Sequence, residues 1–124
     1  MFRANSWTLA SRSNTQFGTS EVWTATAAAK LTNVTVSSTE ARTGYDQMLS
    51  VLAVQSSSGI GAVQAASAAS GAPSVSLTTT KSGSLVYGVG NDWDNSVGRT
   101  VGSGQAMVSQ WVDTTSGDTF WVQD

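Results

Sequence analysis

The chain has 124 residues and a net charge of −2, only 11 % of its residues are charged, and it contains neither cysteine nor histidine. This composition excludes disulfides, thiolate metal sites and catalysis by cysteine or histidine. The six basic residues are scattered along the sequence, so neither a nucleic-acid surface nor binding to an anionic membrane is expected. The length predicts a single domain over residues 1–124, and no apolar run is long enough for a transmembrane helix.

Alternating apolar and polar residues predict an all-β, antiparallel fold with about eight strands. The first two strands are expected at residues 6–12 and 21–26, joined by a turn at Gly18 that makes them a hairpin. Alternation at residues 31–36 predicts a third strand. The nearly continuous apolar run at residues 47–55 predicts a fourth strand, buried on both faces.

The second half of the sequence begins with an alanine- and glycine-rich stretch at residues 60–72, which we interpret as a loop crossing between sheets. The remaining strands are predicted at residues 74–79, 85–90, 106–112 and 118–123. Residues 91–104 form a long loop rich in Gly, Asn, Asp and Ser, and residues 113–117 close the last hairpin. Many short strands with frequent turns predict a β-sandwich, jelly-roll-like in architecture.

Several motifs carry a resemblance to a known module. They are WTL at 7–9, GTSEVW at 18–23, LTNVTV at 31–36, GNDWDN at 90–95, RTVG at 99–102, QWVDT at 110–114 and GDTFWVQ at 117–123. The chain resembles a β-sandwich module of large, secreted, multi-domain bacterial proteins. The resemblance implies a sandwich fold and a secreted or cell-surface location, and it implies no particular biochemical activity.

Two departures from that module matter. Family members usually carry a histidine where this chain has Ser109, and their modules usually begin several strands before Met1. The chain therefore resembles the C-terminal two-thirds of a longer module, which would leave an unpaired strand edge. We expect such an edge to be completed by self-association into a homo-oligomer or by a strand from a partner protein.

The long loop gathers the candidate binding residues. Four of them carry side-chain oxygens: Asn91, Asp92, Asp94 and Asn95. Oxygen ligands suit hard cations, so calcium is a candidate cofactor with Asp92 and Asp94 as metal ligands. The loop is not an EF-hand, because Val97 stands where that motif needs glycine. The alternative is that these side chains cap and stabilise a long turn.

Trp93 lies between Asp92 and Asp94 in this loop. An exposed indole beside carboxylates and amides is suited to bind sugars, because the flat ring stacks on a sugar while the polar groups bond its hydroxyls. Loops on a rigid sheet scaffold are also where binding residues concentrate. For the other tryptophans, which lie in predicted strands, packing in the core is the better interpretation.

The remaining chemistry is weaker. No spacing among the eight acidic residues selects a catalytic pair, so the chain is not expected to be an enzyme. Lys30 or Lys81 with Glu21 or Glu40 would permit a spontaneous lysine cross-link, but solvated surface lysines are the simpler interpretation. The sequence thus predicts a non-catalytic structural or interaction module, with a carbohydrate-binding module that uses residues 91–95 as the alternative.

Overall fold

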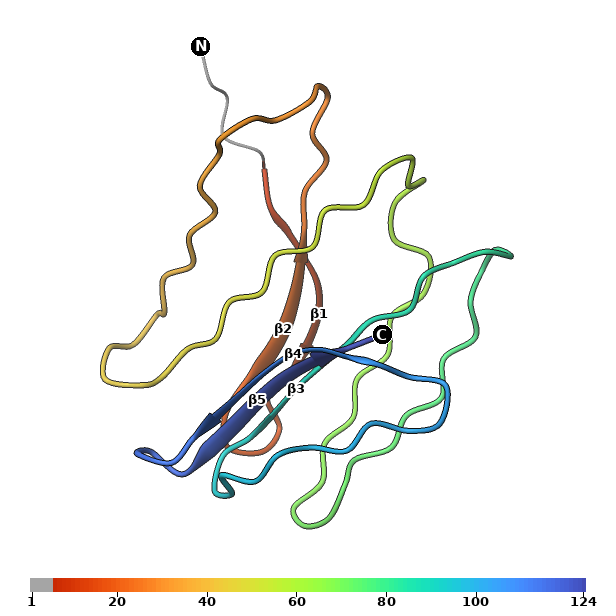
Figure 1. Cartoon of the computed structure of the whole chain (residues 1–124). Helices are drawn as coiled ribbons and strands as arrows, with labels where there is room; N and C mark the ends of the chain where they lie inside the picture. Colours follow the sequence, from red (N-terminus) through yellow and green to blue (C-terminus); the bar gives the residue numbers. More distant parts are fainter. Residues whose placement is uncertain (1–5) are drawn as a thin grey trace.

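A computed structural model describes residues 6–124 and shows an all-β fold without helices in that range (Figure 1). Five strands form two small antiparallel sheets. The first sheet pairs β1 with β2, and the second has the order β3-β5-β4. The strands are β1 Thr8–Ser13, β2 Ser20–Thr24, β3 Gly88–Asp92, β4 Met107–Asp113 and β5 Asp118–Gln123. No helix that could span a membrane occurs within residues 6–124.

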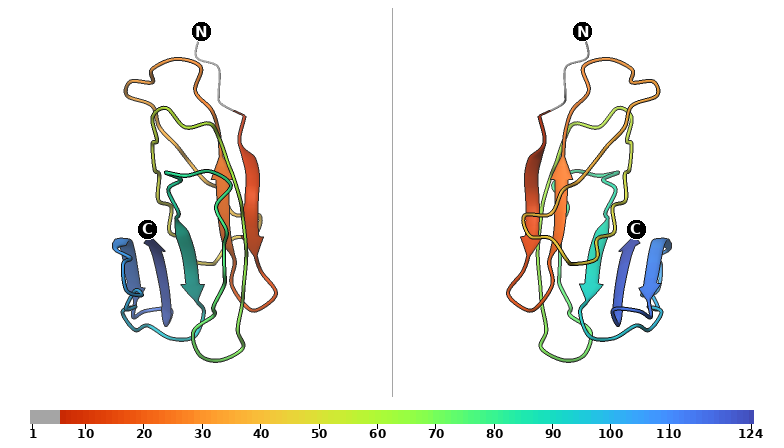
Figure 2. Two further views of the ribbon diagram at one scale, coloured as in Figure 1. Left: turned by 90° about the vertical axis from the view of Figure 1, so that its right-hand side faces the viewer. Right: turned by 90° about the vertical axis from the view of Figure 1, so that its left-hand side faces the viewer.

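The two sheets lie side by side rather than face to face. Figure 2 shows the five strands in one row, with β2 next to β3 and with β1 and β4 at the outer ends. No ladder of backbone hydrogen bonds joins β2 to β3, so the row has a seam at its middle. The outer edges of β1 and β4 have no strand paired to them in the described part of the chain.

The two expected hairpins are confirmed, and their turns explain why they form. At the β1–β2 turn, Gly18 has a φ of 80°, a left-handed conformation that glycine adopts without strain. At the β4–β5 turn, the amide of Gly117 donates to the carbonyl of Asp113 at 3.0 Å. The Asp113 carboxylate also accepts the amide of Thr115 at 2.8 Å, so this side chain closes the turn as an Asx motif.

Residues 25–87 are the largest difference from the sequence predictions. The strands expected at residues 31–36, 47–55 and 74–79 are absent, and the one expected at 85–90 is displaced to β3. The structure therefore has five strands where about eight were predicted. In Figure 1 this part of the chain runs as long, stretched loops beside the strands.

Backbone geometry and pairing explain this correction. Asn33, in the middle of the expected third strand, has a φ of 53°, which is incompatible with extended strand geometry. A strand also needs a hydrogen-bonded neighbour. Within the described residues, no strand pairing includes residues 25–87, and their hydrogen-bonded turn at residues 82–83 forms no ladder. These residues have the alternating apolar pattern of strands, but within the described residues no other strand pairs with them.

The buried interior is small and lies at β5 and the turn beside it. Val122 is the only apolar residue among residues 6–124 that is less than a tenth exposed, at 8 %. Thr119 is fully buried, and Asp113 and Asp118 are almost so. Many large apolar side chains lie in water instead, most of them in residues 25–87.

Candidate functional site

Three aromatic side chains from three separate turns meet at one end of the strand row. Trp93 directly follows β3, Phe17 lies in the β1–β2 turn, and Tyr45 lies in a bend of the stretched loops. The ring centroids of Phe17 and Trp93 are 5.9 Å apart and nearly parallel, and those of Tyr45 and Trp93 are 6.1 Å apart and tilted. The exposed fractions of Phe17, Tyr45 and Trp93 are 80 %, 55 % and 41 %. We call these three residues the aromatic platform.

Gly18 allows the turn that carries Phe17 to lie close to β3. A Cβ at Gly18 would collide with the side chain of Asn91 in β3, so the β1–β2 turn can approach β3 only because residue 18 has no side chain. Phe17 precedes this close approach, and Trp93 comes two residues after Asn91. The contact between the turn and β3 therefore brings the two rings together.

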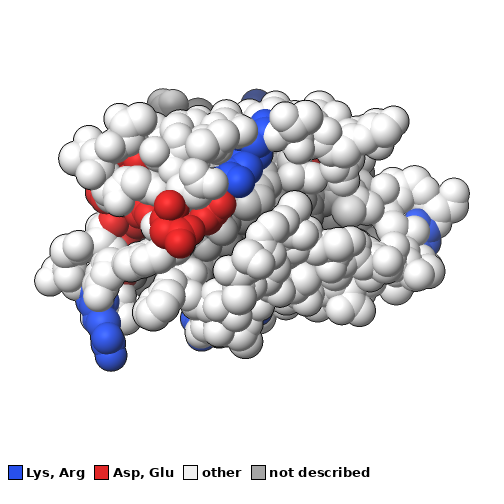
Figure 3. Space-filling model, turned by 90° about the horizontal axis from the view of Figure 1, so that it is seen from below, with Lys and Arg blue, Asp and Glu red and all other residues white. Residues whose placement is uncertain are grey.

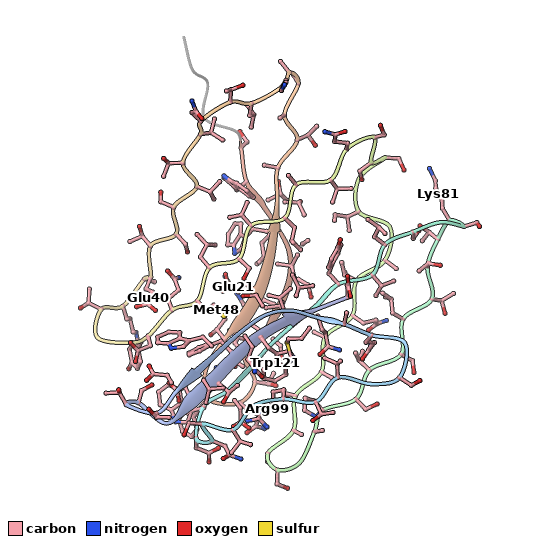
Figure 4. All side chains as sticks on the ribbon, in the orientation of Figure 1. Glu21, Glu40, Met48, Lys81, Arg99 and Trp121 are labelled. Atoms are coloured by element: carbon pink, nitrogen blue, oxygen red, sulfur yellow. The ribbon has the colours of Figure 1, made fainter. Side chains whose placement is uncertain are left out.

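Arg99 fixes the loop that carries Trp93. Its guanidinium forms an ion pair with the carboxylate of Asp92 and donates to the carbonyl of Asn95 at 3.0 Å. The same group lies 5.5 Å from the ring centroid of Trp121 on β5, where the cation faces the aromatic ring (Figure 4). The backbone amide of Arg99 donates to Gln110 Oε1 at 2.6 Å, which ties the loop to β4 as well.

Thr119, on β5, also holds the loop that carries Trp93. Its hydroxyl lies 2.7 Å from the carbonyl of Asn95 and 3.1 Å from that of Val97, so it donates to this pair of oxygens from a fully buried position. The loop after β3 is thus held by β4 and β5 through polar contacts. Trp93 is presented by a supported loop.

The five predicted site residues have different roles. Trp93, Asp94 and Asn95 are exposed, whereas Asn91 and Asp92 are half-buried. Asp92 accepts the backbone amide of Asp94 at 3.4 Å, as expected of an Asx side chain that stabilises a turn. Asp92, the last residue of β3, therefore supports the loop, whereas Asn91 lies in β3 with its side chain near Gly18 of the β1–β2 turn. Trp93, Asp94 and Asn95 are exposed and can contact a ligand.

The carboxylates of this loop are not grouped for a metal ion. Among residues 6–124, no three acidic, histidine or cysteine side chains gather closely enough to hold one. The carboxylate of Asp92 forms an ion pair with the guanidinium of Arg99, which leaves Asp94 as the loop's other carboxylate. Calcium takes six to eight oxygens, so any calcium site here would also need amide and carbonyl oxygens.

The lysine cross-link finds no support in the positions of the labelled side chains. Figure 4 shows Lys81 at the tip of a turn, far from both Glu21 and Glu40. The Lys81 amine lies 3.4 Å from the hydroxyl of Ser58 and donates to it, beside a small polar cavity. Glu21 instead pairs with Arg12 at 2.7 Å and accepts the indole N–H of Trp23 at 2.6 Å.

The end of the molecule seen in Figure 3 is largely uncharged, with acidic groups gathered in one place and basic groups separated from one another.

Comparison with family models, with curated proteins and with solved structures gives no match to this chain. The site is therefore interpreted from its own geometry.

The sequence analysis missed Phe17, Tyr45 and Arg99. Phe17 and Tyr45 are far from Trp93 in the sequence, and no local pattern marks either of them as its neighbour. A signal for Arg99 did exist: it is the only basic residue of the long loop, four residues after the carbonyl of Asn95 that it binds.

Proposed function

We propose that this chain is a non-catalytic structural module that completes its fold by assembling with a second copy of itself. The observation that supports the proposal is the large area that the chain leaves exposed to solvent. The chain has an accessible area of 9749 Å². A folded monomer of this mass exposes about 6,300 Å², so the excess is about 3,400 Å².

This excess area is large enough to form the interface of a stable dimer. Obligate homodimer interfaces bury roughly 2,000 to 5,000 Å² in total over both partners. An excess of about 3,400 Å² on each chain is enough for an interface of this class. Burial of this surface would supply the apolar contacts that the small interior around Val122 lacks.

The surface that would be covered runs along residues 25–87. Their large apolar side chains are exposed, and within the described chain their backbone amides and carbonyls take part in no strand pairing. Stretched backbone with unpaired groups is a template for strand pairing. We infer that these groups pair across the interface, as the strands expected at residues 31–36, 47–55 and 74–79 would.

A second copy fits this surface better than a different protein does. A twofold interface uses the same patch on both chains, so each copy brings both the apolar side chains and the unpaired backbone groups. The net charge of −2 gives little repulsion between identical chains. In such an assembly the copies supply each other's second layer, so the predicted sandwich belongs to the assembled protein.

The resemblance to modules of secreted bacterial proteins supports a secreted or cell-surface setting for this assembly. Modules of that kind are linked in long chains, where a sandwich spaces or displays its neighbours. A structural role of this kind requires an interface and needs no catalytic group.

Light scattering after size-exclusion chromatography, over a range of chain concentrations, tests the proposal. We expect a dimer mass that falls toward the monomer on dilution. Val51 is 54 % exposed within the proposed interface, and Val51→Lys should shift the equilibrium to monomer because it places a charge among apolar groups. Thr114→Lys adds the same charge at an exposed polar position outside residues 25–87 and serves as the matched control.

Hydrogen exchange on the same samples reports on the backbone. In the wild-type assembly, amides of residues 25–87 should be protected, and in Val51→Lys they should exchange freely. A chain that is monomeric at every concentration overturns the proposal. A heterologous strand partner is indicated instead if the monomer becomes protected only when another protein is added.

A further inference from the structure

We propose that the aromatic platform of Phe17, Tyr45 and Trp93 is a binding site for neutral polysaccharide. This site overlaps the proposed assembly surface only at Tyr45, which lies within residues 25–87. The turns that carry Phe17 and Trp93 lie at one end of the strand row, outside the stretched loops (Figures 1 and 2). The inference does not depend on the proposed assembly.

The platform offers the apolar half of a sugar site. Phe17 and Trp93 are stacked with an interplanar angle of 28°, so each ring covers part of the other, and Tyr45 is tilted by 46° to Trp93. The three rings remain partly exposed and together form an apolar surface. Sugar rings carry C–H groups on their faces, which pack against exposed aromatic rings.

The rim of the platform supplies the polar half. Asp94 and Asn95 follow Trp93 directly and are both exposed. Their carboxylate and amide oxygens accept hydrogen bonds, which suits the hydroxyl donors of a sugar. A few polar groups around an apolar surface fix the orientation of a ligand in most binding sites.

The charged groups around the platform favour a neutral ligand. Arg99, the basic residue of the loop that carries Trp93, is paired with Asp92 and faces Trp121, so its charge is directed away from a ligand on the platform. Asp94 leaves the rim with a negative charge. An acidic polysaccharide would meet this carboxylate without a compensating cation from Arg99.

The platform is preorganised. The loop with Trp93 is held by Arg99 and by the buried hydroxyl of Thr119. Phe17 is held by the close approach of Gly18 to Asn91. Rings that are already in place lose little conformational entropy on binding, so a modest number of contacts gives measurable affinity.

Titration with cellohexaose tests the inference, with hexagalacturonate as an acidic probe of equal length. The indole N–H signals in ¹⁵N-correlated NMR spectra report on each tryptophan, and the Trp93→Phe variant assigns the signal of Trp93. We expect cellohexaose to shift the Trp93 signal and hexagalacturonate to leave it unchanged. Trp93→Ala should weaken binding about tenfold or more, and Phe17→Ala should weaken it several-fold.

Trp7→Ala is the matched control, because Trp7 is 47 % exposed and lies outside the platform. It should leave cellohexaose binding within about twofold of wild type. A Trp93 signal that does not move at millimolar cellohexaose overturns the inference, as does equal weakening by Trp7→Ala and Trp93→Ala.

Repeating the titration on Val51→Lys separates this inference from the proposed assembly. We expect equal binding to the wild type and to the variant, whether or not the chain assembles. Binding by the variant alone would show that the platform is covered by a second copy in the assembly, and it would overturn the claim that the site is independent of assembly.

Discussion

The indole ring of Trp121 lies over Gly90, its partner in the register between β3 and β5, so closely that a Cβ at Gly90 would overlap the ring. On the same ring, the indole N–H donates to Gln123 Oε1 at 2.9 Å and the guanidinium of Arg99 lies 5.5 Å from the centroid. Gly90 therefore leaves the space in which Trp121 joins β3, β5 and the loop after β3.

Gly90→Ala should destabilise the fold by about 1–3 kcal/mol, because the new methyl group forces the Trp121 ring away from β3. Gly88→Ala on the same strand is the control. A Cβ there would meet only the side chain of Gln123, at 3.3 Å, and this flexible side chain can move aside. Urea unfolding followed by tryptophan fluorescence measures both. Equal stability of the two variants would contradict the role of the ring.

Gly18→Ala should destabilise the chain by more than its backbone conformation explains. Gly18 has a φ of 80°, and Gly104 has a φ of 78° with open space around it, so alanine suffers the same backbone strain at both positions. Only at Gly18 does the methyl group also collide with Asn91. We expect the free energy of unfolding to fall by about 1–2 kcal/mol more for Gly18→Ala than for Gly104→Ala.

The Gly18→Ala variant should also move Phe17 away from Trp93. Nuclear Overhauser contacts between the two rings measure this directly, and they should weaken in Gly18→Ala and persist in Gly104→Ala. Unchanged ring contacts in Gly18→Ala would show that the turn is positioned by something other than the gap at residue 18.

The sequence predicted strands best where the partner strand is close in the chain. The first and last hairpins have turns whose residues favour the required geometry, with Gly18 in one and Asp113 and Gly117 in the other. Residues 47–55 have an equally strong apolar pattern, but no strand pairs with them in the structure. A periodic pattern identifies a segment able to form a strand, and the pairing depends on a partner that the pattern does not specify.

The candidate site was predictable only in its local part. One interpretation of the loop was that its Asx side chains stabilise a long turn, and the contact of Asp92 with the amide of Asp94 agrees with that alternative. The exposure of Trp93 also agrees with its proposed role. Phe17 and Tyr45 reach Trp93 through the packing of turns that are distant in sequence, and neither composition nor periodicity carries that information.

Acid should weaken the β4–β5 turn through Asp113. The backbone N–H of Thr115, helped by Ser116, holds the pKa of the Asp113 carboxyl below its ordinary value of 3.8. The folded state therefore releases this proton at a lower pH than the unfolded state does. The resulting stabilisation is fully present above the ordinary pKa and is lost as the pH falls through the lowered pKa of the folded state.

Asp113→Asn isolates this effect, because the amide oxygen can still accept the hydrogen bonds but does not titrate. We expect the variant to be less stable than wild type at about pH 6, and the difference to shrink as the pH approaches about 2. Urea midpoints at several pH values measure the difference. A difference that stays constant with pH would show that the Asp113 charge contributes nothing to the turn.

Thr119→Val should be among the most damaging small substitutions in the chain. Thr119 is fully buried, and its hydroxyl donates to the carbonyls of Asn95 and Val97. The carbonyl of Asn95 also accepts from Arg99 and from the amide of Val97, so valine mainly removes the hydrogen bond to the carbonyl of Val97. The expected cost is about 1–3 kcal/mol.

Thr119→Ser keeps the hydroxyl and loses only a methyl group, so its cost should be smaller, near 1 kcal/mol by the usual value of one buried carbon. The two variants also differ in what they do to the loop. Thr119→Val should free residues 93–97 and raise their amide exchange, and Thr119→Ser should not. If serine costs more than valine, the contribution of Thr119 comes mainly from packing of its methyl group rather than from its hydrogen bonds to the loop.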